Sequence, residues 1–235
     1  MAAPDAPEPR VGRVLDSAAE LLVRWGYQRV TIEDVARDAG IGKGTVYLHF
    51  RSKDALFLTV LMRVHRQIVE RMADRMAADP QEVLPSRTMR SLYEELMAEP
   101  VARRLYLGDP EVLGRLAHEA TDTLGELSVR RMRAVEEHMR LLADGGCLRP
   151  GLDPDSALYA FAAISTGFLA VDGLSDTLPQ LDAEARADLL QRTIAAAIEV
   201  PDPPAAALER VAPGIAQRYR DLLVHLDHEW RRRVR

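Results

Sequence analysis

Apolar residues recur at intervals of three and four along most of the chain, which is the spacing of one face of an α-helix. Strict alternation of apolar and polar residues, which would predict β-strands, is absent from the sequence. The pattern therefore predicts an all-α protein. The helices we expect cover residues 10–25, 32–39, 43–50, 53–76, 85–98, 100–107, 110–143 (with a break near Thr121), 154–174, 183–200 and 208–230 (with a kink at Pro213-Gly214).

Residues 31–50 carry the sharpest helix signals in the chain. Thr31 is a good N-cap, and Asp34 three residues later can complete a capping box. Gly40 follows the last helical residue, where a left-handed conformation favours glycine. The segment is therefore predicted to form two short helices joined by a glycine-containing turn.

The second short helix has two chemically different faces. Val46 and Phe50 fall on the buried side, together with Ile41 before the helix. The other side carries Lys43, Gly44, Thr45, Tyr47 and His49. A small helix with a polar and aromatic face suits the major groove of DNA. We therefore interpret the pair as a helix-turn-helix.

From Arg10 to Leu58 the order and spacing of these features resemble the TetR family of bacterial transcriptional regulators. The matching strings are W-G-Y before Thr31, then T-I-E-D-V-A-R-D-A-G, K-G-T-V-Y-L-H-F and S-K-D-A-L. The rest of the chain matches only in being helical and of suitable length. One position departs from the family pattern: Leu48 stands where members more often carry a polar or aromatic residue, which concerns base preference and not the fold.

Several side chains of this segment are candidates for contacts with DNA. Lys43 is placed for a guanine edge or a phosphate, and Thr45 offers a methyl group to thymine or a hydroxyl to a phosphate. The resemblance implies that Tyr47 and His49 donate to phosphate oxygens. The full set of candidates is Thr31, Lys43, Gly44, Thr45, Tyr47, His49 and Lys53. One reading helix covers few base pairs, so we expect a homodimer on a palindromic operator in double-stranded DNA.

The resemblance also implies the domain organisation. We expect a disordered arm over 1–9, a helix-turn-helix domain over 10–55, a ligand-binding and dimerisation domain over 56–200, and a C-terminal helical extension over 201–235. Repression is the default activity, because a dimer on a promoter blocks polymerase by its volume.

The composition changes this picture little. The net charge is −5, but residues 10–55 carry eight basic and six acidic side chains, and both lysines of the chain lie there. A mildly basic end on an acidic body orients the molecule toward phosphates. No run of apolar residues reaches the length that we expect of a membrane span, and the proline-rich acidic start is unlike a signal peptide, so we expect a cytoplasmic protein without a membrane partner.

The resemblance and the helical architecture imply that the body binds a small apolar or amphipathic ligand. Methionines that adapt to irregular shapes, beside polar-tipped aromatic residues, are compatible with such a pocket. The candidate lining is Met62, His65, Met89, Tyr93, Met97, Tyr106, Met132, Met139, Phe161 and Ser165. An alternative is a ligand-independent DNA-binding or architectural adaptor protein whose helical body is filled.

Two strongly apolar helices, 154–174 and 183–200, close the body. The first is too hydrophobic around its circumference for the surface of a monomer, so we expect the pair to form a four-helix bundle with a second copy. The candidate interface is Leu158, Phe161, Ala162, Phe168, Leu190, Ile194, Ala197 and Ile198. The alternative is that both helices belong to the core of the monomer.

Other chemistry finds little support. The string G-I-G-K-G-T lacks the Ser or Thr that a phosphate-binding loop needs after its lysine, and no strand precedes it. His225 and His228, near Asp227 and Glu229, could ligate a metal, but histidines on an exposed terminal helix more often face solvent. Cys147 has no neighbouring base. We therefore expect no enzyme, no cofactor, no catalytic residue and no metal site.

Overall fold

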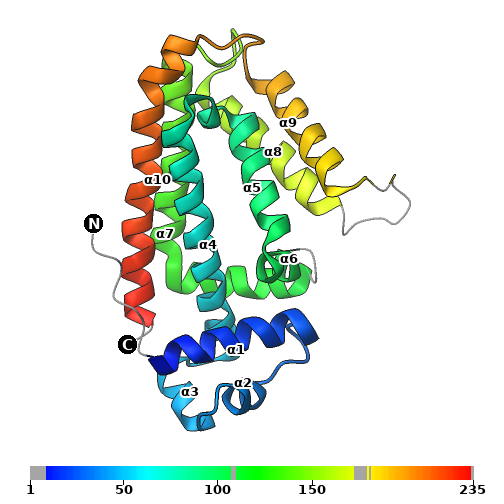
Figure 1. The fold of residues 1–235 in the computed structure, drawn as a ribbon. Helices are drawn as coiled ribbons and strands as arrows, with labels where there is room; N and C mark the ends of the chain where they lie inside the picture. Colours follow the sequence, from blue (N-terminus) through cyan, green and yellow to red (C-terminus); the bar gives the residue numbers. More distant parts are fainter. Residues whose placement is uncertain (1–8, 107–109, 172–178, 180, 234–235) are drawn as a thin grey trace. The chain divides into compact units, whose positions relative to one another are not determined.

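The computed structural model describes residues 9–106, 110–171, 179 and 181–233, with side chains from 106 to 128 described only at Leu116 and Leu127. The described residues are helical without strands, which confirms the all-α prediction (Figure 1). The elements are α1 (Pro9–Trp25), α2 (Ile32–Asp38), α3 (Lys43–His49), α4 (Lys53–Ala78), the short 3-10 helix η1 (Pro80–Val83), α5 (Pro85–Ala98), α6 (Pro100–Tyr106), α7 (Pro110–Asp144), α8 (Pro154–Val171), α9 (Ala183–Ile198) and α10 (Ala205–Arg233).

One local expectation was wrong. The helix α7 runs without the break expected near Thr121, because a glycine inside a helix costs only about 1 kcal/mol and does not by itself end it. The helix α10 continues through Pro213, where the sequence predicts a kink. Trp25 of the W-G-Y string is 39% exposed at the end of α1. The predicted disordered arm lies outside the described residues, except for Pro9, which begins α1.

The chain divides into two compact units that do not follow the expected boundaries at residues 55 and 200. Unit 1 consists of residues 1–67, 99–128 and 224–235, and unit 2 of residues 68–98 and 129–223. The difference arises because α4, α7 and α10 each contribute residues to both units. Residues 31–50 therefore share unit 1 with parts of the body and of the C-terminal helix.

The core of unit 1 joins α1, α2 and α3 to the start of α4. Its apolar residues are buried, with an exposed fraction of at most 5% for each of Leu15, Leu22, Ile32, Val35, Val46 and Phe50. The start of α4 adds Leu56 and Phe57, which are fully buried. Ser52 caps α4, since its hydroxyl accepts the Ala55 N–H at 2.9 Å.

In unit 2, α9 packs along α5 and α8 packs against α9. Three apolar residues of α9 face the interior and are completely buried: Leu190, Ile194 and Ile198. The amphipathic stripe of α10 is also buried within unit 2 from Leu208 to Leu222. The C-terminal extension is therefore an integral part of the fold.

Two buried polar groups connect distant segments of unit 2. The carboxylate of Glu199 accepts hydrogen bonds from the backbone N–H and the hydroxyl of Ser86, at 2.6 and 3.0 Å, in the first turn of α5. Burial raises the pKa of Glu199. His138 contacts the Val83 carbonyl oxygen at 2.6 Å and the Tyr219 hydroxyl at 3.1 Å. Burial lowers the pKa of His138 to about 4, so the ring is neutral near pH 7.

Candidate DNA-binding site

The helix α2 is fixed at both ends by local hydrogen bonds. The Thr31 hydroxyl accepts the Asp34 N–H at 3.2 Å while Asp34 accepts the Thr31 N–H at 3.1 Å, which is the expected capping box. At the other end Gly40 has a φ of +67°. The Ile41 N–H then reaches the Ala36 carbonyl at 2.9 Å, which closes a Schellman motif. These caps set the turn that leads into α3.

The helix α3 presents one face to the core and one to solvent. Val46 is fully buried, and Phe50, which follows the helix, is 2% exposed. Lys43, Gly44, Tyr47 and Leu48 form the opposite side, where Tyr47 is 46% and Leu48 80% exposed. Lys43 and Tyr47 are four residues apart, and so are Gly44 and Leu48. The four positions therefore lie along one exposed face of the helix.

Lys43 has two partners within unit 1. Its ammonium group forms an ion pair with Glu33 of α2, and its Nζ atom lies 5.8 Å from the centre of the Tyr47 ring. The hydrogen bond to Glu33 raises the pKa of Lys43 and lowers the pKa of Glu33. Both side chains are about half exposed, so DNA can replace the carboxylate at little cost.

The remaining DNA-binding candidates differ in how accessible they are. The Thr31 hydroxyl already donates to Asp34 at 2.6 Å, so its first role is to cap α2. Gly44 is exposed, whereas Thr45 and His49 are half-buried. The Nδ1 atom of His49 is covered and has no hydrogen-bond partner among the described residues.

Lys53 is held at the start of α4 by the loop that precedes α2. Its Nζ atom lies 4.2 Å from the centre of the Tyr27 ring and 3.5 Å from the Gln28 carbonyl oxygen. Tyr27 is itself fixed by a hydrogen bond from its hydroxyl to Asp54 and by an edge contact with Phe57. The structure thus places Lys53 in unit 1 with the other candidates, as expected.

The sequence prediction missed Glu33 and Tyr27, which position the two lysines. Glu33 and Lys43 are ten residues apart on different helices, so no helical periodicity connects them. Only the angle of the turn between α2 and α3 brings them together. Tyr27 was visible as part of the W-G-Y string, but its contact with Lys53 depends on the fold.

The ten candidates for a ligand lining are divided between the units. Met62, His65 and Tyr106 belong to unit 1, where Met62 is buried, His65 is half-buried, and the Tyr106 side chain is outside the described residues. The other seven belong to unit 2. Met89, Tyr93 and Met139 are each 1% exposed, and Met97 and Phe161 are half-buried.

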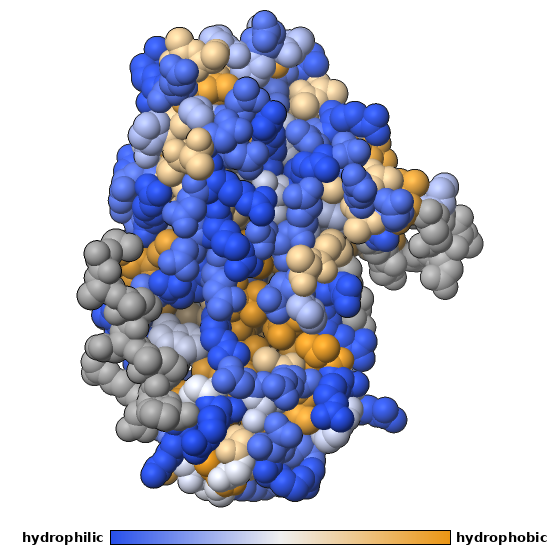
Figure 2. Space-filling model, in the orientation of Figure 1, coloured by the Kyte–Doolittle hydropathy of each residue, from blue (hydrophilic) through white to orange (hydrophobic). Residues whose placement is uncertain are grey.

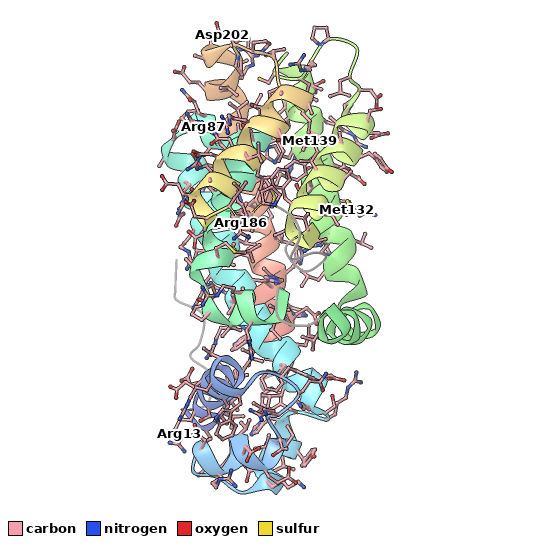
Figure 3. All side chains as sticks on the ribbon, turned by 90° about the vertical axis from the view of Figure 1, so that its right-hand side faces the viewer. Arg13, Arg87, Met132, Met139, Arg186 and Asp202 are labelled. Atoms are coloured by element: carbon pink, nitrogen blue, oxygen red, sulfur yellow. The ribbon has the colours of Figure 1, made fainter. Side chains whose placement is uncertain are left out.

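Two members of the unit 2 group stand out. Met132 is 49% exposed, within a turn of α7 whose residues 129–133 are all exposed, so its assignment to an enclosed lining is wrong (Figure 3). Ser165 of α8 is 9% exposed, and its hydroxyl has no hydrogen-bond partner among the described residues. A buried hydroxyl without a partner is costly, and such groups mark sites that a ligand can complete.

The candidate dimer interface also needs correction. Leu190, Ile194 and Ile198 are fully buried within unit 2 and cannot contact a second copy. They were assigned to the interface because the apolar face of α9 can be predicted from the sequence, whereas the surface that this face packs against cannot. Ala162 and Ala197 are exposed, and Leu158, Phe161 and Phe168 are half-buried.

The helix α8 is left largely uncovered. Only Ala157 and Ser165 of this helix are buried, and Tyr159 is 79% exposed. Figure 2 shows hydrophobic residues mixed with hydrophilic ones on the side of unit 2 where α8 and α9 lie. The helix has a mean hydropathy of 1.2 over 18 residues, which makes it, among the described helices, the one that could cross a bilayer by length and composition. The sequence expectation concerned uninterrupted apolar runs, and polar residues interrupt the apolar ones in α8.

Within the part of the chain that the structure describes, no group of three His, Cys, Asp or Glu side chains is arranged to hold a metal. Cys147 is buried, and burial raises the pKa of its thiol, which disfavours the reactive thiolate. The geometry of unit 1 is therefore the clearest functional feature of the chain.

Comparison with known proteins agrees with this geometry. Residues 14–60 match the sequence model for bacterial regulatory proteins of the tetR family. The chain is 30% identical over 176 residues to the HTH-type transcriptional regulator TtgR of Pseudomonas putida, a match that covers 72% of this chain and 80% of that protein. It is 29% identical over 162 residues to the HTH-type transcriptional activator FasR of Mycolicibacterium smegmatis, covering 65% of this chain and 72% of that protein.

Among solved structures, a complex of SmeT with triclosan has the same fold. SmeT is the repressor of a multidrug efflux pump of Stenotrophomonas maltophilia. The TM-score with the complex is 0.61 at 22% identity, and the match covers 84% of this chain and 95% of SmeT. The caps of α2, the exposed face of α3 and the extent of the match to TtgR lead to one conclusion: the chain belongs to the TetR family of bacterial transcriptional regulators.

Proposed function

We propose that the protein is a homodimeric repressor that binds a palindromic operator and is released from it by a small apolar or amphipathic molecule. The observation that carries the DNA-binding part is the exposed face of α3, on which Lys43 and Tyr47 project beside Gly44. The caps of α2 hold this face in a fixed orientation, so it is preorganised for the major groove. Two copies are needed because one short helix covers too few base pairs.

The ligand part is supported by unit 2. Buried methionine and tyrosine side chains supply adaptable apolar surface, and the buried Ser165 hydroxyl supplies an unused polar group. SmeT, a structure with the same fold, has been solved as a complex with triclosan. In the proposed mechanism the ligand favours one position of α4, which contributes residues to both units, and thereby changes DNA affinity.

Selection of bound DNA from a random pool tests the DNA-binding part. The expected result is an inverted repeat that the purified protein retains in a gel shift. Addition of triclosan should release that DNA from the parent protein and release less of it from Ser165→Ala. Failure to retain any sequence at low salt would contradict DNA binding. If the protein retains DNA and no small apolar probe changes this retention, the result would favour a ligand-independent DNA-binding protein with a filled body.

Activation is the second candidate activity, because the relative FasR is named as an activator. A reporter gene behind the selected operator distinguishes the two. Repression predicts higher expression when the gene for this protein is deleted, and activation predicts lower expression.

A further inference from the structure

Leu48 is the most exposed large hydrophobic side chain among the described residues, at 80%. It lies in α3 between Tyr47 and His49, in the middle of the candidate DNA-binding site. The buried side of the helix is already filled by Val46 and Phe50. Leu48 therefore contributes little to the packing of unit 1, although a polar residue would be better hydrated at the same position.

Two neighbours of Leu48 on the exposed face, Lys43 and Tyr47, already have interactions within the protein. Lys43 forms an ion pair with Glu33 and lies over the Tyr47 ring. Leu48 has neither a donor nor an acceptor, so it cannot contribute to recognition through a hydrogen bond. What it offers to a partner is an aliphatic surface.

The major groove of DNA presents one aliphatic group, the 5-methyl of thymine. We propose that Leu48 is a specificity-determining residue that selects thymine in each operator half-site by packing against this methyl group. The inference rests on the proposed function, since it requires α3 to enter the major groove. It extends that function by assigning one base of the operator to one residue.

Replacement of thymine by uracil tests the assignment, because it removes only the methyl group. The operator obtained by selection is synthesised with uracil at one symmetric pair of positions at a time. Fluorescence anisotropy then gives the Kd of the parent protein and of Leu48→Ala for each DNA. At one thymine of each half-site, uracil should weaken binding of the parent by about fourfold per contact, the effect of one buried methyl group. Leu48→Ala should bind the thymine and uracil operators equally well.

Two further variants make the test specific. Thr45→Ser removes the other methyl group that could reach thymine, and Val224→Ala shortens an aliphatic residue that is 66% exposed on α10. Val224→Ala should keep the thymine preference of the parent. Thr45→Ser should keep that preference at the thymine assigned to Leu48, whatever it changes at another base or at a phosphate. If Leu48→Ala keeps that preference, or if Thr45→Ser loses it, the assignment of Leu48 is overturned while DNA binding stands. If the parent retains no DNA at all, the proposed function fails and this inference fails with it.

Discussion

Lys43 is held by Glu33, so the proposed contact of Lys43 with DNA would exchange one anionic partner for another. Lys43→Ala should weaken operator binding by about tenfold and reduce the salt dependence of binding by about one counterion. Glu33→Gln should strengthen binding by about threefold, because it frees Lys43 and removes a negative charge near the phosphates. Titrations of labelled operator at several salt concentrations measure both effects.

Glu20→Gln is a matched control for this prediction, since it removes an exposed carboxylate from α1 in the same unit. It should leave the affinity close to that of the parent. Equal gains from Glu20→Gln and Glu33→Gln would mean that net charge alone controls affinity and that the contact between Lys43 and Glu33 is irrelevant.

His138 predicts a pH dependence of stability. Its pKa falls from 6.5 to about 4 on folding, so the unfolded chain binds the proton more tightly. The folded state therefore loses stability as the pH falls from about 6.5 toward 4, and the loss between pH 7 and pH 5 should be about 2 kcal/mol from this residue. Urea unfolding of His138→Gln should show a pH dependence that is smaller by this amount.

Tyr219→Phe is the control for His138, because it removes the hydroxyl partner but keeps the imidazole. It should lower the free energy of unfolding at both pH values and keep the difference between them. The comparison with the parent protein is necessary because Glu199 acts in the opposite direction. Its pKa is raised on folding, so its contribution decreases as the pH rises above about 4.5.

The residues of the candidate site could be predicted from the sequence where their roles are local. The caps of α2 could be predicted from Thr31, Asp34 and Gly40, because each cap involves residues that are only a few positions apart. The partners of Lys43 and Lys53 could not be predicted, because they lie on other segments that the tertiary fold brings near. The assignment of Tyr106 to the ligand lining remains a prediction. The ligand-binding roles of the buried candidates also remain predictions.

At the scale of helices, α10 contacts α4 within unit 1 through a half-buried ion pair between Arg66 and Asp227. Asp227→Asn should lower the free energy of unfolding by about 1 kcal/mol, because the guanidinium loses its charged partner. Urea unfolding measures this change. A double-mutant cycle with Arg66→Gln should give a coupling energy of similar size.

Asp202→Asn is the control for this ion pair, because Asp202 is exposed in the loop before α10 (Figure 3). It should change stability by less than about 0.5 kcal/mol. A coupling energy near zero between positions 66 and 227 would show that this ion pair does not help to hold the C-terminal helix.

The helices themselves were predictable because apolar spacing and proline, glycine and capping residues mark them in the sequence. α5 begins at Pro85 and ends at Ala98, as expected. What a helix packs against was not predictable. The apolar residues of α8 and α9 looked alike in sequence, yet Leu190 of α9 is fully buried whereas Tyr159 of α8 is 79% exposed.

For the whole molecule, the uncovered surface of α8 predicts association with a second copy. Ala162→Glu places a charge on this surface, and we expect it to convert the protein to a monomer in analytical ultracentrifugation. Operator affinity should fall by on the order of a hundredfold, because each reading helix would bind alone. Loss of the dimer with unchanged affinity would contradict the requirement for two reading helices.

Ala206→Glu is the matched control for the dimer, since it adds the same charge to an exposed position of α10. It should remain dimeric. If the parent protein is monomeric and instead binds lipid vesicles, α8 has a membrane partner and the proposal of a dimer fails.

The make-up of unit 1 has a consequence for biosynthesis. Arg66 and Asp227 are 161 residues apart, yet both belong to the unit that contains α3. A ribosome that adds ~5–20 residues per second needs roughly 8–32 s to pass from one to the other. During that interval α3 has already been synthesised, but the contact between Arg66 and Asp227 in the same unit cannot yet form. The unit that contains α3 is thus complete only after residue 227 has been translated.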